Sequence, residues 1–137
     1  MTLFVDTSAF YAAAATSDRS HERAKEILAA GEALVTSDHV LAESWLLLRR
    51  RLGRAAANAF WEAIRAGASS VEHVGPADLE VAWTIAKDFP DQDFSLVDLT
   101  SFAVMQRIGV LRAATLDDDF AVFRFGRRRE RAFEVVR

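Results

Sequence analysis

Residues 3–8 of this sequence read Leu-Phe-Val-Asp-Thr-Ser. The three apolar residues form a short continuous run, which is typical of a strand buried inside a sheet. Asp6 follows this run directly and therefore stands at the carboxyl end of the predicted strand. Open parallel sheets bind their ligands at this edge, so Asp6 is a candidate site residue.

The arrangement around Asp6 recurs near the other end of the chain. Residues 114–120 read Ala-Thr-Leu-Asp-Asp-Asp-Phe, and Asp117 comes directly after a strand predicted over residues 110–116. In one parallel sheet the carboxyl ends of both strands lie at the same edge. The sequence therefore allows Asp6 and Asp117 to meet there.

Apolar runs and helical periodicity alternate along the chain. We expect strands at residues 3–5, 34–36, 71–74, 110–116 and 133–136. We expect helices at residues 9–15, 38–52, 54–66, 76–89, 95–108 and 117–123. A further helix should lie between N-caps at residues 17–20 and the terminating Gly31. This alternation predicts an α/β fold with a mainly parallel central sheet flanked by helices. A chain of 137 residues suits one compact domain, so we expect residues 1–137 to form a single domain.

Two further acids lie near the starts of predicted helices. Glu43 stands about one turn into its helix, where nearly all neighbouring residues are apolar. An unpaired buried carboxylate is costly, so Glu43 is hard to explain as an ordinary surface residue. Asp98 comes three residues after Ser95, and together they resemble a capping box at a helix start.

The chemistry of such a group of acids points to a metal ion. Carboxylates packed together repel each other and raise each other's pKa. Mg²⁺ or Mn²⁺ removes that conflict, because both ions prefer oxygen ligands. Two such ions about 3.5–4 Å apart clamp the attacking and leaving oxygens of a phosphodiester. Asp6, Glu43, Asp98 and Asp117 together therefore favour metal-dependent phosphodiester hydrolysis.

Each acid also has a purely structural interpretation. Asp6 can cap the following helix, Asp98 can interact with the helix dipole, and Asp117 can belong to a polar turn. If these interpretations held for all the acids, the chain would be a catalytically silent binding module. The occurrence of all four acids in one chain favours a metal-binding site over these structural interpretations.

The composition limits the classes of function. The net charge is −3, whereas a protein that binds nucleic acid by charge alone is normally basic. The absence of cysteine excludes disulfides and thiolate metal sites. No apolar run approaches the ~20 residues that span a membrane, and the first residues do not resemble a signal peptide. We therefore expect a cytoplasmic protein with no membrane partner.

Four stretches of the sequence resemble the PIN domain, in particular the VapC-type toxin ribonucleases of type II toxin–antitoxin modules. The matching stretches are Leu3–Ser8, Val40–Ser44 with Leu46–Arg50 behind it, Phe94–Asp98 and Ala114–Phe120. They occur in the family's order and cover nearly the whole chain. The resemblance implies a metal-dependent endoribonuclease that is the toxin of such a pair, with RNA as substrate, a cognate antitoxin protein as partner, and a homodimeric assembly. A PIN-type nuclease of RNA processing is the alternative within the family.

The resemblance also implies roles for individual residues. Asp6, Glu43, Asp98 and Asp117 would form the catalytic site, with Asp6 and Asp98 as the principal Mg²⁺ ligands. Glu43 and Asp117 would hold a second metal ion or its waters, and Asp119, at a position that varies in the family, would join them. The hydroxyls of Thr7, Ser8 and Thr115 would lie near this site, although capping and turn hydrogen bonds explain them equally well.

Two arginine clusters stand out in the remaining sequence. The first comprises Arg49, Arg50, Arg51 and Arg54, and the second Arg124, Arg127, Arg128, Arg129 and Arg131. Such clusters are ordinarily solvated faces, and their functional alternatives are contacts with RNA phosphates or with an acidic partner. The second cluster follows Asp117 closely and is the better RNA candidate.

Tryptophans and a histidine complete the sequence-based predictions. Trp45, Trp61 and Trp83 fall on predicted helices, where we expect them in the core. His39 lies four residues before Glu43, so the two share a helix face. We interpret His39 as a helix-start histidine near solvent rather than as a metal ligand.

Overall fold

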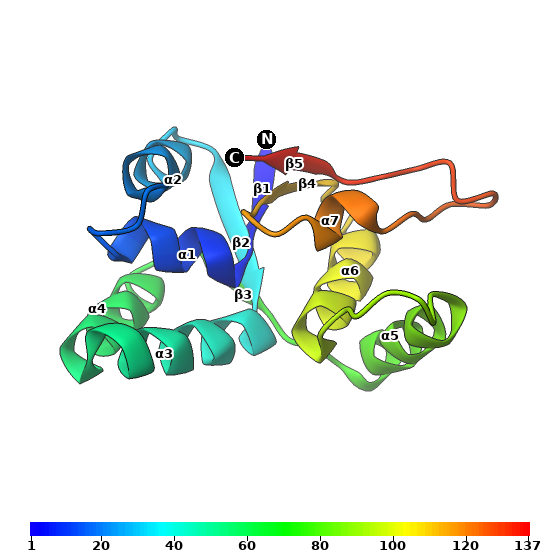
Figure 1. Ribbon diagram of the computed structural model, residues 1–137, viewed down its shortest axis with the longest axis horizontal. Helices are drawn as coiled ribbons and strands as arrows, with labels where there is room; N and C mark the ends of the chain where they lie inside the picture. Colours follow the sequence, from blue (N-terminus) through cyan, green and yellow to red (C-terminus); the bar gives the residue numbers. More distant parts are fainter.

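The computed structural model describes residues 1–137 and contains one five-stranded parallel sheet (Figure 1). Its strands are β1 (Thr2–Val5), β2 (Ala33–Ser37), β3 (Ser70–Glu72), β4 (Arg112–Ala114) and β5 (Glu134–Val136), in the spatial order β3-β2-β1-β4-β5. In the register, β1 places Phe4 opposite both Val35 of β2 and Ala113 of β4. The strand order reverses direction between β1 and β4, and ligands of open α/β sheets bind at such a switch point.

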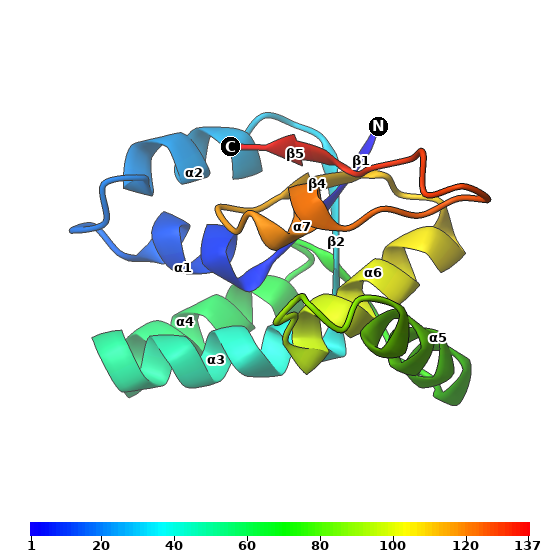
Figure 2. The same ribbon diagram turned by 45° about the vertical axis from the view of Figure 1, so that its right-hand side comes forward.

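Seven helices cover the sheet. They are α1 (Thr7–Ala14), α2 (His21–Leu28), α3 (Asp38–Leu52), α4 (Arg54–Arg65), α5 (Pro76–Asp88), α6 (Leu96–Ile108) and α7 (Asp119–Val122). Figure 1 shows α1–α4 on one side of the strands and α5–α7 on the other, and Figure 2 shows the first turn of α6 beside the start of α3. The predicted α/β fold with a parallel sheet is therefore confirmed.

An aromatic core fixes the position of α6 and α7 against the sheet. The ring of Phe102 on α6 stacks on Phe123 at a centroid distance of 4.5 Å and meets Phe120 edge-on at 5.0 Å. Phe133 adds a fourth ring to this group. Because these side chains are all buried, they lock the segment around Asp117 onto the sheet.

Local hydrogen bonds explain where the helices begin. The Ser37 hydroxyl accepts a hydrogen bond from the Val40 amide at the start of α3. At the start of α6, the Asp98 amide donates to Ser95 Oγ, and the Ser95 amide donates to Asp98 Oδ2. This is the predicted capping box, so Asp98 does serve as a helix cap as well as lining a pocket.

The elements around Asp117 are shorter than predicted. Strand β4 covers Arg112–Ala114 rather than residues 110–116, and α7 covers Asp119–Val122 rather than residues 117–123. The Asp119 amide donates to Asp117 Oδ1, and the Asp117 amide donates to Thr115 Oγ1. These side-chain bonds replace regular backbone pairing with a turn.

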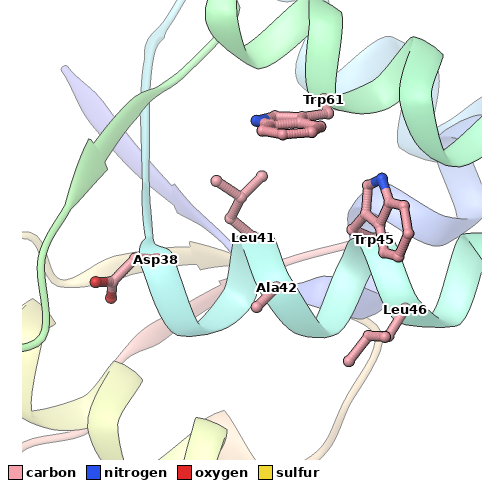
Figure 3. Close-up of a pocket in the computed structure, with 6 residues that line it drawn as sticks. All are labelled: Asp38, Leu41, Ala42, Trp45, Leu46 and Trp61. Carbon is pink, nitrogen blue, oxygen red and sulfur yellow. The ribbon is translucent and has the colours of Figure 1, made fainter.

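The expectation that the three tryptophans lie in the core is wrong. Trp61 and Trp83 are 49% and 62% exposed, and Trp45 is half-buried. Figure 3 shows Trp61 of α4 facing Leu41 and Trp45 of α3 across an apolar pocket between the two helices. Helical periodicity does not reveal which faces of α3 and α4 remain uncovered. None of the helices is both long and apolar enough to cross a membrane.

Candidate active site

A pocket of about 350 Å³ lies at the carboxyl ends of β1 and β4. It is lined by Asp6, Thr7, Ser8, Glu43, Leu47, Asp93, Ser95, Asp98, Asp117 and Asp119. The structure therefore brings all four predicted acids and Asp119 into one cavity, although they come from four distant stretches of sequence. The lining residues include six acids and no lysine or arginine.

Hydroxyl groups hold the carboxylate of Asp6 in place. Ser8 Oγ donates a hydrogen bond of 3.0 Å to Asp6 Oδ2, and Thr115 Oγ1 donates one of 2.9 Å to the same oxygen. The backbone amide of Leu116 in turn donates to Ser8 Oγ at 2.8 Å. Both donors use Oδ2, so Oδ1 is left without a side-chain partner.

Three of the acids form a tighter cluster. One carboxylate oxygen each from Asp98, Asp117 and Asp119 lies within 4.8 Å of the others. Asp98 is buried, whereas Asp117 and Asp119 are half-buried at the rim. Their neighbour Asp118 points elsewhere, because it pairs with Arg137 at 2.8 Å and is largely exposed. The three consecutive aspartates therefore divide between the pocket and the surface.

Burial and mutual repulsion raise the pKa values of these acids. Burial, the charges of Asp117 and Asp6, and a hydrogen bond with Asp119 raise the pKa of Asp98 from 3.8 to about 8. Burial also raises the pKa of Asp6, although hydrogen bonds from Thr115, the Thr7 backbone and Ser8 oppose it. The pKa of Asp119 is raised too, first by burial and then by the charges of Asp117 and Asp118. The pocket thus resists carrying its full negative charge.

The donor set suits a hard divalent cation. Carboxylate oxygens are preferred ligands of such ions, and a cation would relieve the repulsion that raises these pKa values. The Thr7 hydroxyl adds a further observation, since Thr7 lines the pocket, is buried and has no hydrogen-bond partner in the chain. The residues present therefore fit a bound metal ion.

Sequence reasoning missed Asp93, which also lines the pocket. Asp93 lies in the loop before α6, where no periodicity indicates the direction of a side chain. Its position two residues before the helix cap Ser95 could have suggested it, because chain entering a helix at the carboxyl edge of a sheet passes close to the ligand site.

Comparison with known protein families matches residues 3–126 of this chain to the PIN domain. Because the match covers most of the chain and the fold and acidic pocket agree with it, the chain belongs to the PIN domain family.

Individual relatives share most of their length with this chain. The 23S rRNA-specific endonuclease VapC20 of Mycobacterium tuberculosis is 42% identical over 125 residues, which cover 90% of this chain and 95% of the relative. Ribonuclease VapC26 of the same organism is 28% identical over 116 residues, covering 84% and 86%.

Solved structures agree with this assignment. The crystal structure of VapC20, described as a sarcin–ricin loop cleaving toxin, superposes with a TM-score of 0.82 at 40% identity and covers 88% of this chain and 93% of that one. VapBC2 from Rickettsia felis, crystallised with promoter DNA, has a TM-score of 0.67 at 14% identity, with coverages of 89% and 92%. The second likeness shows a shared fold only.

Proposed function

We propose that this chain is a metal-dependent endoribonuclease and the toxin of a toxin–antitoxin pair. The observation that carries the proposal is the convergence of Asp6, Glu43, Asp98 and Asp117 in one pocket without a basic residue. Such a pocket repels an anionic phosphodiester unless a cation is present. The names of the relatives VapC20 and VapC26 supply the reaction class.

Within this proposal, Asp6 and Asp98 would be the principal ligands of Mg²⁺, with Mn²⁺ as a substitute. Glu43, Asp117 and Asp119 would hold a second ion or the waters around it. A divalent ion bound there would lower the pKa of a water and stabilise negative charge on the phosphate. The hydroxyls of Ser8 and Thr115 both donate to Asp6 Oδ2 and so fix the orientation of the carboxylate that would bind the ion.

The reaction is a direct hydrolysis. A water oxygen forms a bond to phosphorus, the bond from phosphorus to a ribose oxygen breaks, and the departing oxygen takes up the proton that the water loses. The carboxylates of the pocket accept hydrogen bonds from the attacking water and orient it. No covalent intermediate with the protein is needed, which agrees with the absence of cysteine.

The relative VapC20 supports a proposal for the RNA substrate of this chain. VapC20 is described as a 23S rRNA-specific endonuclease, and its crystal structure is described as that of a toxin that cleaves the sarcin–ricin loop. At 42% identity over nearly the whole chain, we propose the same loop of 23S rRNA as the substrate of this protein.

We extend the proposal to two protein partners, a cognate antitoxin and a second copy of the chain. The membership in the PIN family and the resemblance to VapC toxins support both. The exposed apolar side chains Leu46, Trp61 and Trp83 also indicate surfaces that protein contacts would cover. Light scattering at micromolar concentration tests the homodimer, and a monomer mass would contradict it.

Mapping of RNA ends tests the enzymatic proposal. The wild type and the Asp6→Asn variant are induced in cells, and the new 5′ ends of total RNA are sequenced. We expect a cut in 23S rRNA with the wild type alone, while circular dichroism shows the variant folded. Equal cutting by the folded variant, or no cutting by the wild type, would refute the proposal.

A further inference from the structure

A second groove adjoins the acidic pocket. It has a volume of about 670 Å³ and shares Thr7, Glu43 and Leu47 with the pocket. The groove extends along one face of α3 from His39 to Arg50, with Val97 of α6 on its other wall. His39 and Arg50 are eleven helical steps apart, so their Cα atoms are separated by about 16 Å at a rise of about 1.5 Å per residue. It therefore offers a path for a strand leading away from the acids.

The two ring nitrogens of His39 differ in their contacts. Nδ1 lies 3.2 Å from the hydroxyl oxygen of Thr100, which also lies 2.9 Å from the backbone oxygen of Leu96 and 3.2 Å from that of Val97. Nε2 has no hydrogen-bond partner in the chain. His39 therefore has one ring nitrogen held by Thr100 and one that is available to a ligand.

Arg50 differs from its two arginine neighbours. The guanidinium of Arg49 lies 5.9 Å from the centre of the Trp45 ring, and that of Arg51 lies 5.5 Å from the Tyr11 ring. Arg50 makes no salt bridge, hydrogen bond or ring contact, and it is the one basic side chain that lines the groove besides His39. Its charge is free to bind an anion.

We propose that this groove holds the strand next to the cleaved bond, with the 2′-hydroxyl of the nearest nucleotide on His39 Nε2 and a phosphate further along the same strand on Arg50. The inference rests on the proposed nuclease function and adds the means by which the site selects RNA. DNA lacks the 2′-hydroxyl, which both donates and accepts hydrogen bonds, so an unpartnered ring nitrogen beside the acids reads that difference. Arg50 supplies a phosphate contact that holds the strand in register.

Two substitutions of His39 separate its two nitrogens. His39→Asn keeps a polar group near the Nδ1 position, which can still contact Thr100, but it removes the group at the Nε2 position. His39→Gln places its amide group near the Nε2 position. The probe is an RNA oligonucleotide containing the mapped cleavage site, together with versions in which one ribose at a time is replaced by deoxyribose.

We expect one deoxyribose substitution next to the cut to lower kcat/KM of the wild type about 3–10-fold, as loss of a neutral hydrogen bond does. His39→Asn should lose a similar factor on the all-RNA probe and become insensitive to that substitution. His39→Gln should retain most of both. If His39→Asn keeps the wild-type sensitivity, or if no flanking deoxyribose matters, the assignment of His39 is overturned.

Salt dependence tests Arg50, with Arg49 as the matched control on the same helix. Each variant is combined with Asp6→Asn, and binding of the RNA probe is followed by fluorescence anisotropy between 50 and 200 mM salt, roughly the range over which phosphate contacts show. Arg50→Gln should reduce the slope of log K against log salt by about 0.7, the value for one single-strand phosphate contact. Arg49→Gln should leave it unchanged.

The outcomes distinguish the subsite from the nuclease itself. Equal slopes for Arg50→Gln and Arg49→Gln would overturn the phosphate contact while cleavage by the wild type still supports the proposed function. A wild type that cleaves no RNA would overturn both.

Discussion

The hydroxyl of Thr115 donates a 2.9 Å hydrogen bond to the carboxylate of Asp6, which lies 109 positions earlier in the chain. Parallel pairing of β1 with β4 makes this contact possible, because Val5 is opposite Ala114 and each polar residue directly follows its strand. The switch point of the sheet thus fixes the orientation of the acid at the centre of the site.

Replacing Thr115 by valine should weaken the site without unfolding the protein. Thr115→Val removes one donor to Asp6 Oδ2 while keeping the shape of the side chain. Partners that orient metal ligands typically contribute 10- to 100-fold to metal affinity, so we expect a loss of about that size for Mn²⁺. Titration of activity with Mn²⁺ measures it. An unchanged Mn²⁺ dependence would show that Thr115 does not position Asp6.

The metal-free protein should lose stability as the pH rises. The pKa of Asp98 is raised from 3.8 to about 8, so between these values the folded state binds more protons than the unfolded state. The stabilisation is complete below about pH 4 and is lost as pH rises toward 8. Thermal unfolding in EDTA at several pH values tests this.

Substitution of Asp98 supplies the comparison for that pH dependence. Asp98→Asn keeps an oxygen for the Ser95 amide but cannot ionise, so its unfolding free energy should exceed that of the wild type by about 1–3 kcal/mol at pH 8 and depend less on pH. Asp118→Asn, at an exposed position outside the pocket, should follow the wild-type profile. If the unfolding free energy of the wild type in EDTA rises between about pH 5 and about pH 8, the raised pKa of Asp98 is contradicted.

The ion pair between Asp78 and Arg107 should make the stability of the protein depend on pH in the opposite sense to Asp98. Burial alone would raise the pKa of Asp78, but bonds of 2.9 and 3.2 Å from Arg107 and one from the Gly75 amide lower it overall. The stabilisation by this ion pair is present above the pKa that Asp78 has in the unfolded chain. It is lost as the pH falls through the lower pKa that Asp78 has in the folded protein.

We therefore expect Asp78→Asn to destabilise the protein by about 1–2 kcal/mol at pH 7, a modest value because Arg107 is partly exposed to water. Urea unfolding at about pH 7 and about pH 3 measures the difference in unfolding free energy between the variant and the wild type. The lower pH is near the pKa of an aspartate in the unfolded chain. The destabilisation should shrink at the lower pH, and a constant difference would contradict the assignment.

Arg127 and Arg128 should contribute to RNA binding through charge. The other arginines of their cluster are engaged, since Arg129 stacks on Phe89 and Arg131 on Phe125. The side chains of Arg127 and Arg128 are exposed and make no contact of this kind. Replacing both by alanine should weaken RNA binding and flatten its salt dependence, with little effect on the melting temperature. Unchanged salt dependence would remove these two residues from the interface.

Much of the fold could be predicted because local patterns and long-range packing agree. Gly53 and Gly109 end helices at the predicted positions, and the Ser95–Asp98 capping box starts α6 as expected. The order of strands could not be read, since the apolar runs of β1 and β2 look alike in isolation. The end of β4 was predicted two residues too late, because the Asp117 amide donates to the Thr115 hydroxyl in a turn rather than to a neighbouring strand.

The candidate site was predicted in part for a similar reason. Asp6 stands directly after β1 and Asp117 three residues after the end of β4, so their edge of the sheet is determined by the chain itself. Asp93 lies on a loop whose direction depends on packing of the neighbouring elements. The exposure of Trp61 likewise depends on which helix faces stay uncovered, and no local pattern records it.

Binding of Mn²⁺ to the purified protein tests the central claim most directly. Electron paramagnetic resonance of free Mn²⁺ reports the bound fraction for the wild type, Asp6→Asn and Asp98→Asn at one pH. The account predicts that the wild type removes Mn²⁺ from solution and that each variant does so much more weakly while remaining folded. A wild type that leaves the Mn²⁺ signal unchanged, or variants that bind as tightly as it does, would contradict it.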